Sequence, residues 1–210
     1  MAMIDAVDIP TTHGMLEGLL RHEGYTSLVG MAAVVCHPHP LGGGTMHNKV
    51  VFTLAKTLGE AGIPALRFNF RGVGRSTGAF DEGRGEADDV RVALDWLAAR
   101  YPATPLLLAG FSFGAWVGLP VGCGDPRVTR IIGAGVPTSL LDVAALTYCA
   151  KPKLIVQGAE DQYGPLASLQ PWYAALTEPK ALRIVPACDH FFTGHQEDLA
   201  EALRGWLAAN

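Results

Sequence analysis

The sequence predicts an α/β fold: a mostly parallel sheet of about eight strands with helices on both faces, in one domain of residues 1–210. Short apolar runs alternate with segments of helical periodicity along the chain, the pattern of a parallel sheet covered by helices. The central runs are continuously apolar, as strands buried on both faces are. A chain of 210 residues without a visible repeat or linker fits a single domain.

The predicted strands are short apolar runs, many bounded by turn-forming residues. They are Ile4–Ile9, Met15–Leu20, Ala32–Cys36, Ala65–Phe70, Pro105–Ala109, Arg130–Ala134, Lys153–Gln157 and Ala181–Val185. The first two precede any helical pattern, so we expect them to form an antiparallel edge.

Helices are predicted where apolar residues recur at helical spacing, within residues 50–58, 90–97 and 199–207,. We interpret these stripes as core packing without a chemical role. Glu86 and Asp89 stand at the start of the second helix, where the helix dipole favours negative charge.

The charge distribution predicts no nucleic-acid partner. Net charge is −4 and the pI is near 5.9, with charges scattered and no basic block that would bind nucleic acid or an anionic membrane. The uncharged run Tyr101–Gly124 is interrupted by prolines and glycines, so we interpret it as a buried strand and helix rather than a membrane span.

The N-terminal residues lack the basic and apolar regions of a signal peptide, which predicts a cytoplasmic protein. The four cysteines lie far apart, with no C-x-x-C pair. We therefore expect reduced thiols.

Residues 110–114, Gly-Phe-Ser-Phe-Gly, join a predicted strand to a helical segment. A serine in such a strand–turn–helix elbow stands exposed at the edge of the sheet, and the flanking glycines leave room for the sharp turn. Alone the pattern is weak, because Ser112 could simply cap the helix. Its interpretation as a nucleophile depends on partners elsewhere in the chain.

A serine nucleophile needs a general base, and in this type of elbow the chain order is serine, acid, histidine. His190 and His195 are the two histidines after Ser112. We prefer His190, because it follows a predicted strand across a short loop. His195 stands where the last helix begins.

The preferred acid is Asp161, which follows the strand Lys153–Gln157 across a glycine turn. Its carboxylate would fix the tautomer of the histidine and stabilise the imidazolium. Glu160 is the neighbouring alternative, and Asp142, in the loop after the preceding strand, is another. Asp189 we interpret as a turn residue.

The run His-Pro-His-Pro-Leu-Gly-Gly-Gly at residues 37–44 follows the third predicted strand, where this type of site takes one oxyanion donor. The prolines have no N–H to offer. We predict an oxyanion hole formed by the backbone N–H groups of Phe113 and Leu41, with Gly42 as the alternative to Leu41.

Two other interpretations of this region are less favoured. His37, His39 and His47 lie close in sequence, but no pattern of a hydrolytic metal site accompanies them. No Gly-Lys-Ser/Thr follows the glycines, so they form no phosphate-binding loop of that type. We expect neither a metal nor a cofactor.

Three motifs together resemble a known family. Residues 37–40 (His-Pro-His-Pro), 69–78 (Asn-Phe-Arg-Gly-Val-Gly-Arg-Ser-Thr-Gly) and 110–114 are similar to compact α/β-hydrolases related to dienelactone hydrolases and prolyl-oligopeptidase catalytic domains. They resemble more closely a bacterial branch of small hydrolases without a lid. The resemblance extends over about residues 4–207.

This resemblance implies the α/β-hydrolase fold and the triad Ser112, Asp161 and His190. The chain departs from it at Asn69, where many members have aspartate, and we expect this to affect loop bonding rather than chemistry. Arg71 is expected to hold loops rather than substrate.

Hydrolases of this fold often carry a lid after the sixth strand. Here only residues 135–152 are available, enough for a loop and a short helix around Leu140–Leu146, so we predict no lid domain. The active site should then be an open apolar cleft, bounded by Leu41, Phe111, Phe113, Tyr163, Phe191 and Phe192.

The expected activity is hydrolysis of small carboxylic esters with short to medium acyl groups through an acyl-enzyme. Thioesters, lactones and small peptides use the same machinery and stay open as alternatives. A non-catalytic α/β-hydrolase-fold protein that binds a ligand is the rival of another class, and a metal-dependent hydrolase is a third. Oligomeric state does not follow from the sequence.

Overall fold

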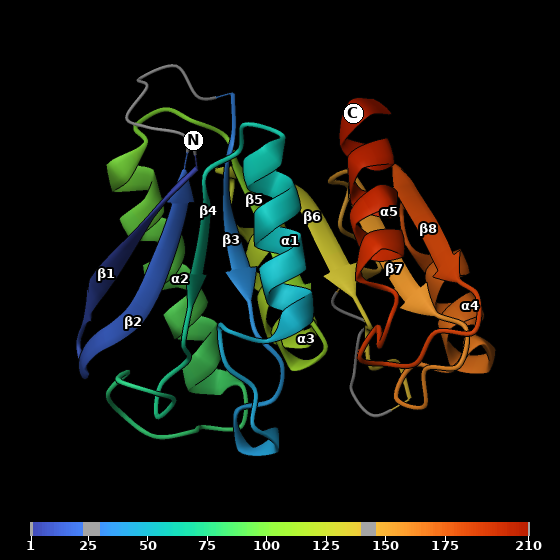
Figure 1. Cartoon of the computed structure of the whole chain (residues 1–210), viewed down its shortest axis with the longest axis horizontal. Coiled ribbons are helices and arrows are strands. Elements are labelled where there is room, and N and C mark those ends of the chain that lie inside the picture. Colours follow the sequence, from blue (N-terminus) through green and yellow to red (C-terminus); the bar gives the residue numbers. More distant parts are fainter. Residues whose placement is uncertain (1, 23–29, 140–145, 210) are drawn as a thin grey trace.

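The computed structural model contains an eight-stranded sheet in the order β1-β2-β4-β3-β5-β6-β7-β8 (Figure 1). β1 pairs with β2, and β2 with β4, in antiparallel fashion, and the other neighbours are parallel. The strands are β1 Met3–Thr11, β2 Gly14–His22, β3 Ala32–Cys36, β4 Ala65–Phe68, β5 Leu106–Phe111, β6 Val128–Ala134, β7 Lys153–Gly158 and β8 Lys180–Val185. The structure describes residues 2–22, 30–139 and 146–209.

Helices cover both faces of the sheet. They are α1 Lys49–Glu60, α2 Arg84–Arg100, α3 Phe113–Gly124, α4 Leu166–Ala175 and α5 Gln196–Ala209, with a 3-10 turn η1 at Pro40–Gly42. α1 and α5 pack together on one face, and α2 and α3 on the other (Figure 1). Since all parallel strands end at the same edge, the loops after them converge there.

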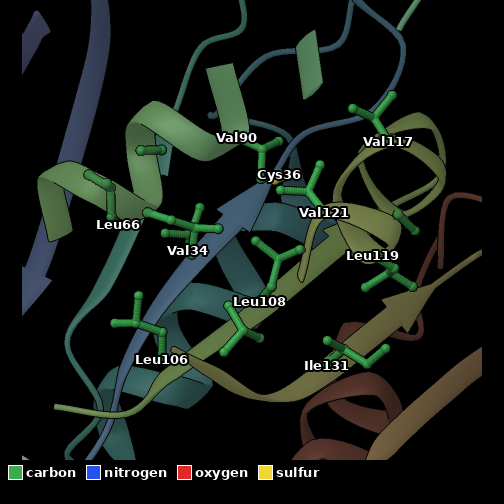
Figure 2. Close-up of a cluster of buried hydrophobic side chains, with 14 of the residues drawn as sticks. Val34, Cys36, Leu66, Val90, Leu106, Leu108, Val117, Leu119, Val121 and Ile131 are labelled. Atoms are coloured by element: carbon green, nitrogen blue, oxygen red, sulfur yellow. The ribbon is translucent and has the colours of Figure 1, made fainter. Parts of the chain in front are cut away.

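The core lies in two layers, one on each side of the sheet. Figure 2 shows part of the α2–α3 side, where Val34, Leu108 and Ile131 from three neighbouring strands meet Val90 of α2 and Leu119 of α3. All are almost fully buried. Burial of such aliphatic side chains contributes about 1.5–3 kcal/mol each. The layer holds the central strands rigidly beneath the edge where the loops meet.

The predicted fold class is confirmed: eight strands, an antiparallel edge of the first two, and helices on both faces. The uncharged run after Tyr101 forms β5 and α3, as expected. Within the described residues, no helix has the length and apolar character needed to cross a membrane.

Two details of the helices differ from expectation. α4 was not predicted, because its apolar residues follow no helical stripe and Pro171 lies inside it. At α2, Glu86 accepts hydrogen bonds from the N–H groups of Gly83 (2.7 Å) and Asp81 (2.9 Å), but Asp89 is buried in an ion pair with Arg71. Glu86 is thus the acidic residue of the first turn of α2, and Asp89 instead holds the loop that carries Arg71.

The chain carries no lid domain. β6 ends at Ala134 and β7 begins at Lys153, so only residues 135–152 connect them, too few for a lid domain. The helix expected around Leu140–Leu146 lies outside the described residues, except for Leu146 itself. The connection begins at the carboxyl edge of the sheet, directly after Ala134.

The expectation of four reduced thiols is wrong for one pair. Cys123 and Cys149 form a disulfide with their Cα atoms 5.7 Å apart. Their wide sequence spacing hid the pair, because only the fold brings the end of α3 beside the segment before β7. Cys36 and Cys188 are free and buried, and burial raises the pKa of Cys188 to about 11. The cytoplasmic location, for which reduced thiols were the expected state, stays a prediction.

Candidate active site

Ser112 stands at the turn between β5 and α3, with φ 55° and ψ −120°. A non-glycine residue pays a strain cost for such a backbone conformation, which is typical of functional turns. A Cβ added at Gly110 would lie 2.4 Å from the carbonyl oxygen of Gly114, and one added at Gly114 would lie 2.5 Å from that of Cys36. Both glycines are therefore required for the turn that presents the serine hydroxyl.

A continuous chain of hydrogen bonds joins Ser112 to Asp161 through His190. The Nε2 atom of His190 lies 2.9 Å from Oγ of Ser112, and its Nδ1 atom lies 2.8 Å from Oδ2 of Asp161. Because the carboxylate accepts, the neutral ring carries its proton on Nδ1 and leaves Nε2 free to accept from the serine. The histidine and the aspartate are buried, and Ser112 is partly exposed.

Asp161 is fixed by three further donors. Its Oδ1 accepts from the N–H groups of Tyr163 (2.8 Å) and Gly164 (2.9 Å), and its Oδ2 from Nε2 of Gln157 (2.8 Å). The amide of Gln157 also accepts from the N–H of Val136 (2.8 Å). This fully buried glutamine holds the carboxylate and the start of the β6–β7 loop together.

Gln157 was not singled out from the sequence. A buried glutamine at the end of an otherwise apolar strand, four residues before the candidate acid, was the available signal, because a buried amide needs polar partners.

The competing acids and base lie in other settings. His195, at the start of α5, binds Asp198 (2.7 Å), and Oδ1 of Asp189 accepts from the N–H of Thr193 (2.9 Å), as its interpretation as a turn residue predicts. Glu160 is exposed. Asp142 lies outside the described residues. Within the described part of the chain, Asp161 is the carboxylate in contact with His190.

Three aromatic rings surround the imidazole of His190. Their centroids lie 5.0 Å (Phe111), 4.6 Å (Tyr163) and 5.2 Å (Phe191) from its own. Edge and tilted contacts of this kind fix the orientation of a ring. The imidazole is therefore held both by its hydrogen bonds and by packing.

His37 supports the loop opposite the serine. Its Nδ1 donates to the carbonyl of Pro38 (2.6 Å), and its Nε2 accepts from the N–H of Phe70 (3.0 Å). Each ring nitrogen has one backbone partner, and this arrangement requires the neutral ring. Burial lowers the pKa of His37 to about 4, since the charged form loses its hydration.

We predict that His37 makes the protein less stable in acid. Its pKa is about 4 in the folded chain and about 6.5 when unfolded. The unfolded state therefore takes up the proton first as pH falls, and the free energy of unfolding decreases by about 3 kcal/mol through this window. Urea unfolding at about pH 7.5 and about pH 4.5 measures the change.

Replacement His37→Asn should reduce this pH dependence, while His47→Asn, at an exposed position, should leave it intact. An unchanged slope in His37→Asn would show that other groups govern acid stability.

The two loop N–H groups considered as oxyanion donors both form hydrogen bonds within the loop. The Leu41 N–H donates to Nδ1 of His39 (3.2 Å) at the start of η1, and the Gly42 N–H donates to the carbonyl of His39 (3.0 Å). The Leu41 side chain is 74% exposed. Among the described residues, no hydrogen bond occupies the N–H of Phe113 or of His39. These two groups are free to donate to an oxyanion.

The loop of residues 69–78 is held as expected. Arg71 binds the buried carboxylate of Asp89 through its side chain (2.8 Å) and its backbone N–H (2.9 Å). Asn69 accepts from the N–H of Met46 (2.8 Å) and donates to the carboxylate of Glu17 (2.9 Å). An aspartate at position 69 could not donate to Glu17, so the departure from the family pattern matches its partner and affects loop bonding.

A pocket of about 460 Å³ opens beside Ser112 and His190. Phe113, Tyr163 and Phe191 line it as predicted. The prediction was wrong for three residues: Leu41 is exposed outside the lining, and Phe111 and Phe192 are fully buried in the core. Pro38, His39 and Pro137 border it instead. Within the described residues, no carboxylate, lysine or arginine lines this pocket.

Within the described residues, no group of three or more histidines, cysteines or carboxylates is arranged to hold a metal ion. Two of the histidines after β3 have ring nitrogens that are already hydrogen-bonded. Both ring nitrogens of His37 bind backbone groups. His39 uses one to cap η1.

Comparison with known proteins places this site in a family. A family model described as serine aminopeptidase, S33, matches residues 32–139, which include β3 through the elbow. A second model, PhoPQ-activated pathogenicity-related protein, matches residues 137–207. An uncharacterized protein of Rickettsia prowazekii is 36% identical over 203 residues, covering 92% of this chain and 84% of its own length.

Solved structures support the same family assignment. An alpha-beta serine hydrolase homologue from Coxiella burnetii is 37% identical, with a TM-score of 0.89 and 96% of each chain covered. A protein of Xanthomonas campestris described as a member of the α/β serine hydrolases without lid is 35% identical, with a TM-score of 0.90 over 98% of this chain and 94% of its own.

Proposed function

We propose that this chain, which belongs to the lid-free serine hydrolases of the α/β-hydrolase superfamily, cleaves small carboxylic esters through a triad of Ser112, His190 and Asp161. The observation that carries the proposal is the unbroken hydrogen-bond chain between these side chains at a strained elbow. A nucleophile, its base and the group that orients the base are what acyl transfer by serine requires.

In the proposed mechanism, Oγ of Ser112 attacks the ester carbonyl while Nε2 of His190 takes its proton. Asp161 keeps the imidazole in the required tautomer and stabilises the imidazolium. His190 then protonates the departing alcohol, and an acyl-enzyme remains. Water, deprotonated by His190, attacks the acyl-enzyme and releases the acid and the free serine.

The tetrahedral intermediate carries an oxyanion that needs backbone donors. Phe113 supplies one N–H, at the first residue of α3. For Leu41 to supply the other, its N–H would have to leave the ring of His39. We therefore propose the N–H of His39, which borders the pocket and is free within the described residues, as the second donor ahead of Leu41 and Gly42.

The shape of the pocket supports small esters with short to medium acyl groups. The pocket is open to solvent, lined mostly by apolar and aromatic side chains, and without a lid above it. Thioesters, lactones and small peptides remain alternatives that use the same groups. A non-catalytic binding role has no feature in its favour, since the hydrogen-bonded triad has no gap.

The experiment that tests the proposal is turnover of a panel of 4-nitrophenyl esters with acyl chains of increasing length, beside matched thioesters, lactones and aminoacyl anilides. We expect the highest kcat/KM on short to medium esters, and no turnover by Ser112→Ala, with the fold checked by circular dichroism. If the folded wild type cleaved no ester, the proposal would fail. A preference for another substrate class would reassign the activity within the same machinery.

A further inference from the structure

A second hollow of about 490 Å³ lies beside the catalytic pocket, near the starts of α1 and α5. The two share Gly43, Asn48 and Phe191 in their walls. Since Asn48 borders both, a substrate bound at Ser112 that is long enough to pass Asn48 would place its far end in the second hollow. The second hollow is the part of the surface that would meet the far end of such a substrate.

The two hollows differ in chemistry. The catalytic pocket is walled mainly by prolines, glycines and aromatic rings. The second hollow is lined by polar side chains: Thr45, His47, Asn48, Lys49, Thr193 and Gln196. A matching ligand has an apolar part beside Ser112 and a polar end beyond Asn48.

Lys49 gives the second hollow its charge. It is the one lysine, arginine or carboxylate among the described residues that line this hollow. Its side chain forms no ion pair within the described part of the chain. By contrast, Lys56, two turns further along α1, pairs with Glu60 (3.6 Å), and Arg204 of α5 pairs with Glu197. These paired charges line the next hollow along the helices, which Lys49 also borders. Of the described lysines, arginines and carboxylates that line these two hollows, Lys49 is the one without an ion pair.

The position of Lys49 does not favour the helix that contains it. Lys49 is the first residue of α1, whose first turn holds no acidic residue. A cation at a helix N-terminus is disfavoured by the helix dipole. An anion placed in the second hollow would be attracted by the ammonium group and offset this repulsion.

We propose that the second hollow is a subsite for an anionic group, so that the preferred substrates are esters carrying a carboxylate away from the scissile bond. Lys49 binds the carboxylate, and the ester carbonyl lies at Ser112. This inference rests on the proposed esterase function and adds the class of ester. Lys49 acts here as a specificity residue for the substrate and takes no part in proton transfer.

The test compares esters that differ only in charge. Mono(4-nitrophenyl) adipate is paired with its neutral methyl ester to place the charge on the acyl side. 4-Acetoxybenzoate is paired with methyl 4-acetoxybenzoate to place it on the alcohol side. The readout is the ratio of kcat/KM for the anionic ester over its neutral partner, in the wild type, Lys49→Gln, Lys49→Glu and the control Lys56→Gln.

We expect the wild type to prefer the anionic ester about five-fold in one of the pairs, as one partly exposed ion pair allows. The ratio should fall to about one or below in Lys49→Gln, fall further in Lys49→Glu, and stay unchanged in Lys56→Gln. The preference should also weaken at high salt, because exposed charges are screened.

Two results would overturn this inference while leaving the esterase function intact. In the first, the wild type cleaves the neutral esters but favours neither anionic partner. In the second, the wild type has a preference that Lys49→Glu leaves unchanged. If the folded wild type cleaved no ester of either kind, the proposed function would fail and the anionic subsite with it.

Discussion

His190→Ala is expected to lower kcat on an ester substrate by about 10⁴-fold or more, the range seen when a triad histidine is removed. Without the imidazole, Ser112 loses the base that takes its proton, and the buried carboxylate of Asp161 loses its partner. The residual rate would come from the oxyanion donors and substrate binding. Steady-state kinetics with a 4-nitrophenyl ester measure the effect.

His195→Ala is the matched control, because it removes the same side chain five residues further on. His195 is partly exposed and binds Asp198 at the start of α5. Its loss should change kcat by no more than a few-fold. Equal losses of kcat in the two variants would show that His190 is wrongly assigned as the base.

Asp161→Asn is expected to lower kcat by about 10³–10⁴-fold with little change in KM. The backbone N–H groups of Tyr163 and Gly164 bind Oδ1, so the oxygen of an asparagine stays on that side. Its amide then faces Nδ1 of His190 and Nε2 of Gln157, which both donate in the native site. To avoid the clash, the imidazole takes the other tautomer, whose Nε2 proton blocks acceptance from the serine.

Two controls locate the acid. Glu160→Gln changes the adjacent exposed carboxylate and should leave kcat within a few-fold. Asp142→Asn tests the alternative from the loop after β6 and should also be mild. A mild effect of Asp161→Asn together with a severe effect of Asp142→Asn would move the acid to that loop.

Much of the fold followed from local patterns. Continuous apolar runs such as Leu106-Leu107-Leu108 can be buried on both faces only inside a parallel sheet, and all eight strands were found. α4 was missed because its register depends on packing rather than on a stripe of its own, and Pro171 argues locally against a helix,. The disulfide of Cys123 and Cys149 depends on contacts between distant segments, which spacing does not reveal.

The candidate site, too, was predictable where local patterns determine it and not where it depends on contacts between distant segments. Ser112, Asp161 and His190 each follow a strand, so their order along the chain indicated that they would meet at one edge. The loop of residues 37–44 could not be placed in this way. Its N–H directions depend on η1 and on the ring of His39 capping it, which no periodicity specifies. Gln157 was missed for a similar reason, since its partners come from two different loops, one after β6 and one after β7.

The pocket residues show a limit of sequence proximity. Phe111 and Phe192 lie within two residues of the proposed triad in the chain, yet both belong to the buried core. Pro137 is distant from the triad in sequence and borders the pocket. Side chains of consecutive residues can point in opposite directions, so closeness in sequence to the triad does not by itself identify a residue that lines the pocket.

The central claim is that Ser112 is an activated nucleophile. Its most direct test is labelling of the purified, folded protein with a fluorophosphonate probe, followed by mass spectrometry of its peptides. We expect one adduct, on Ser112, that is absent in Ser112→Ala and strongly reduced in His190→Ala. A folded wild type that takes up no label, or carries it on another residue, would contradict the account.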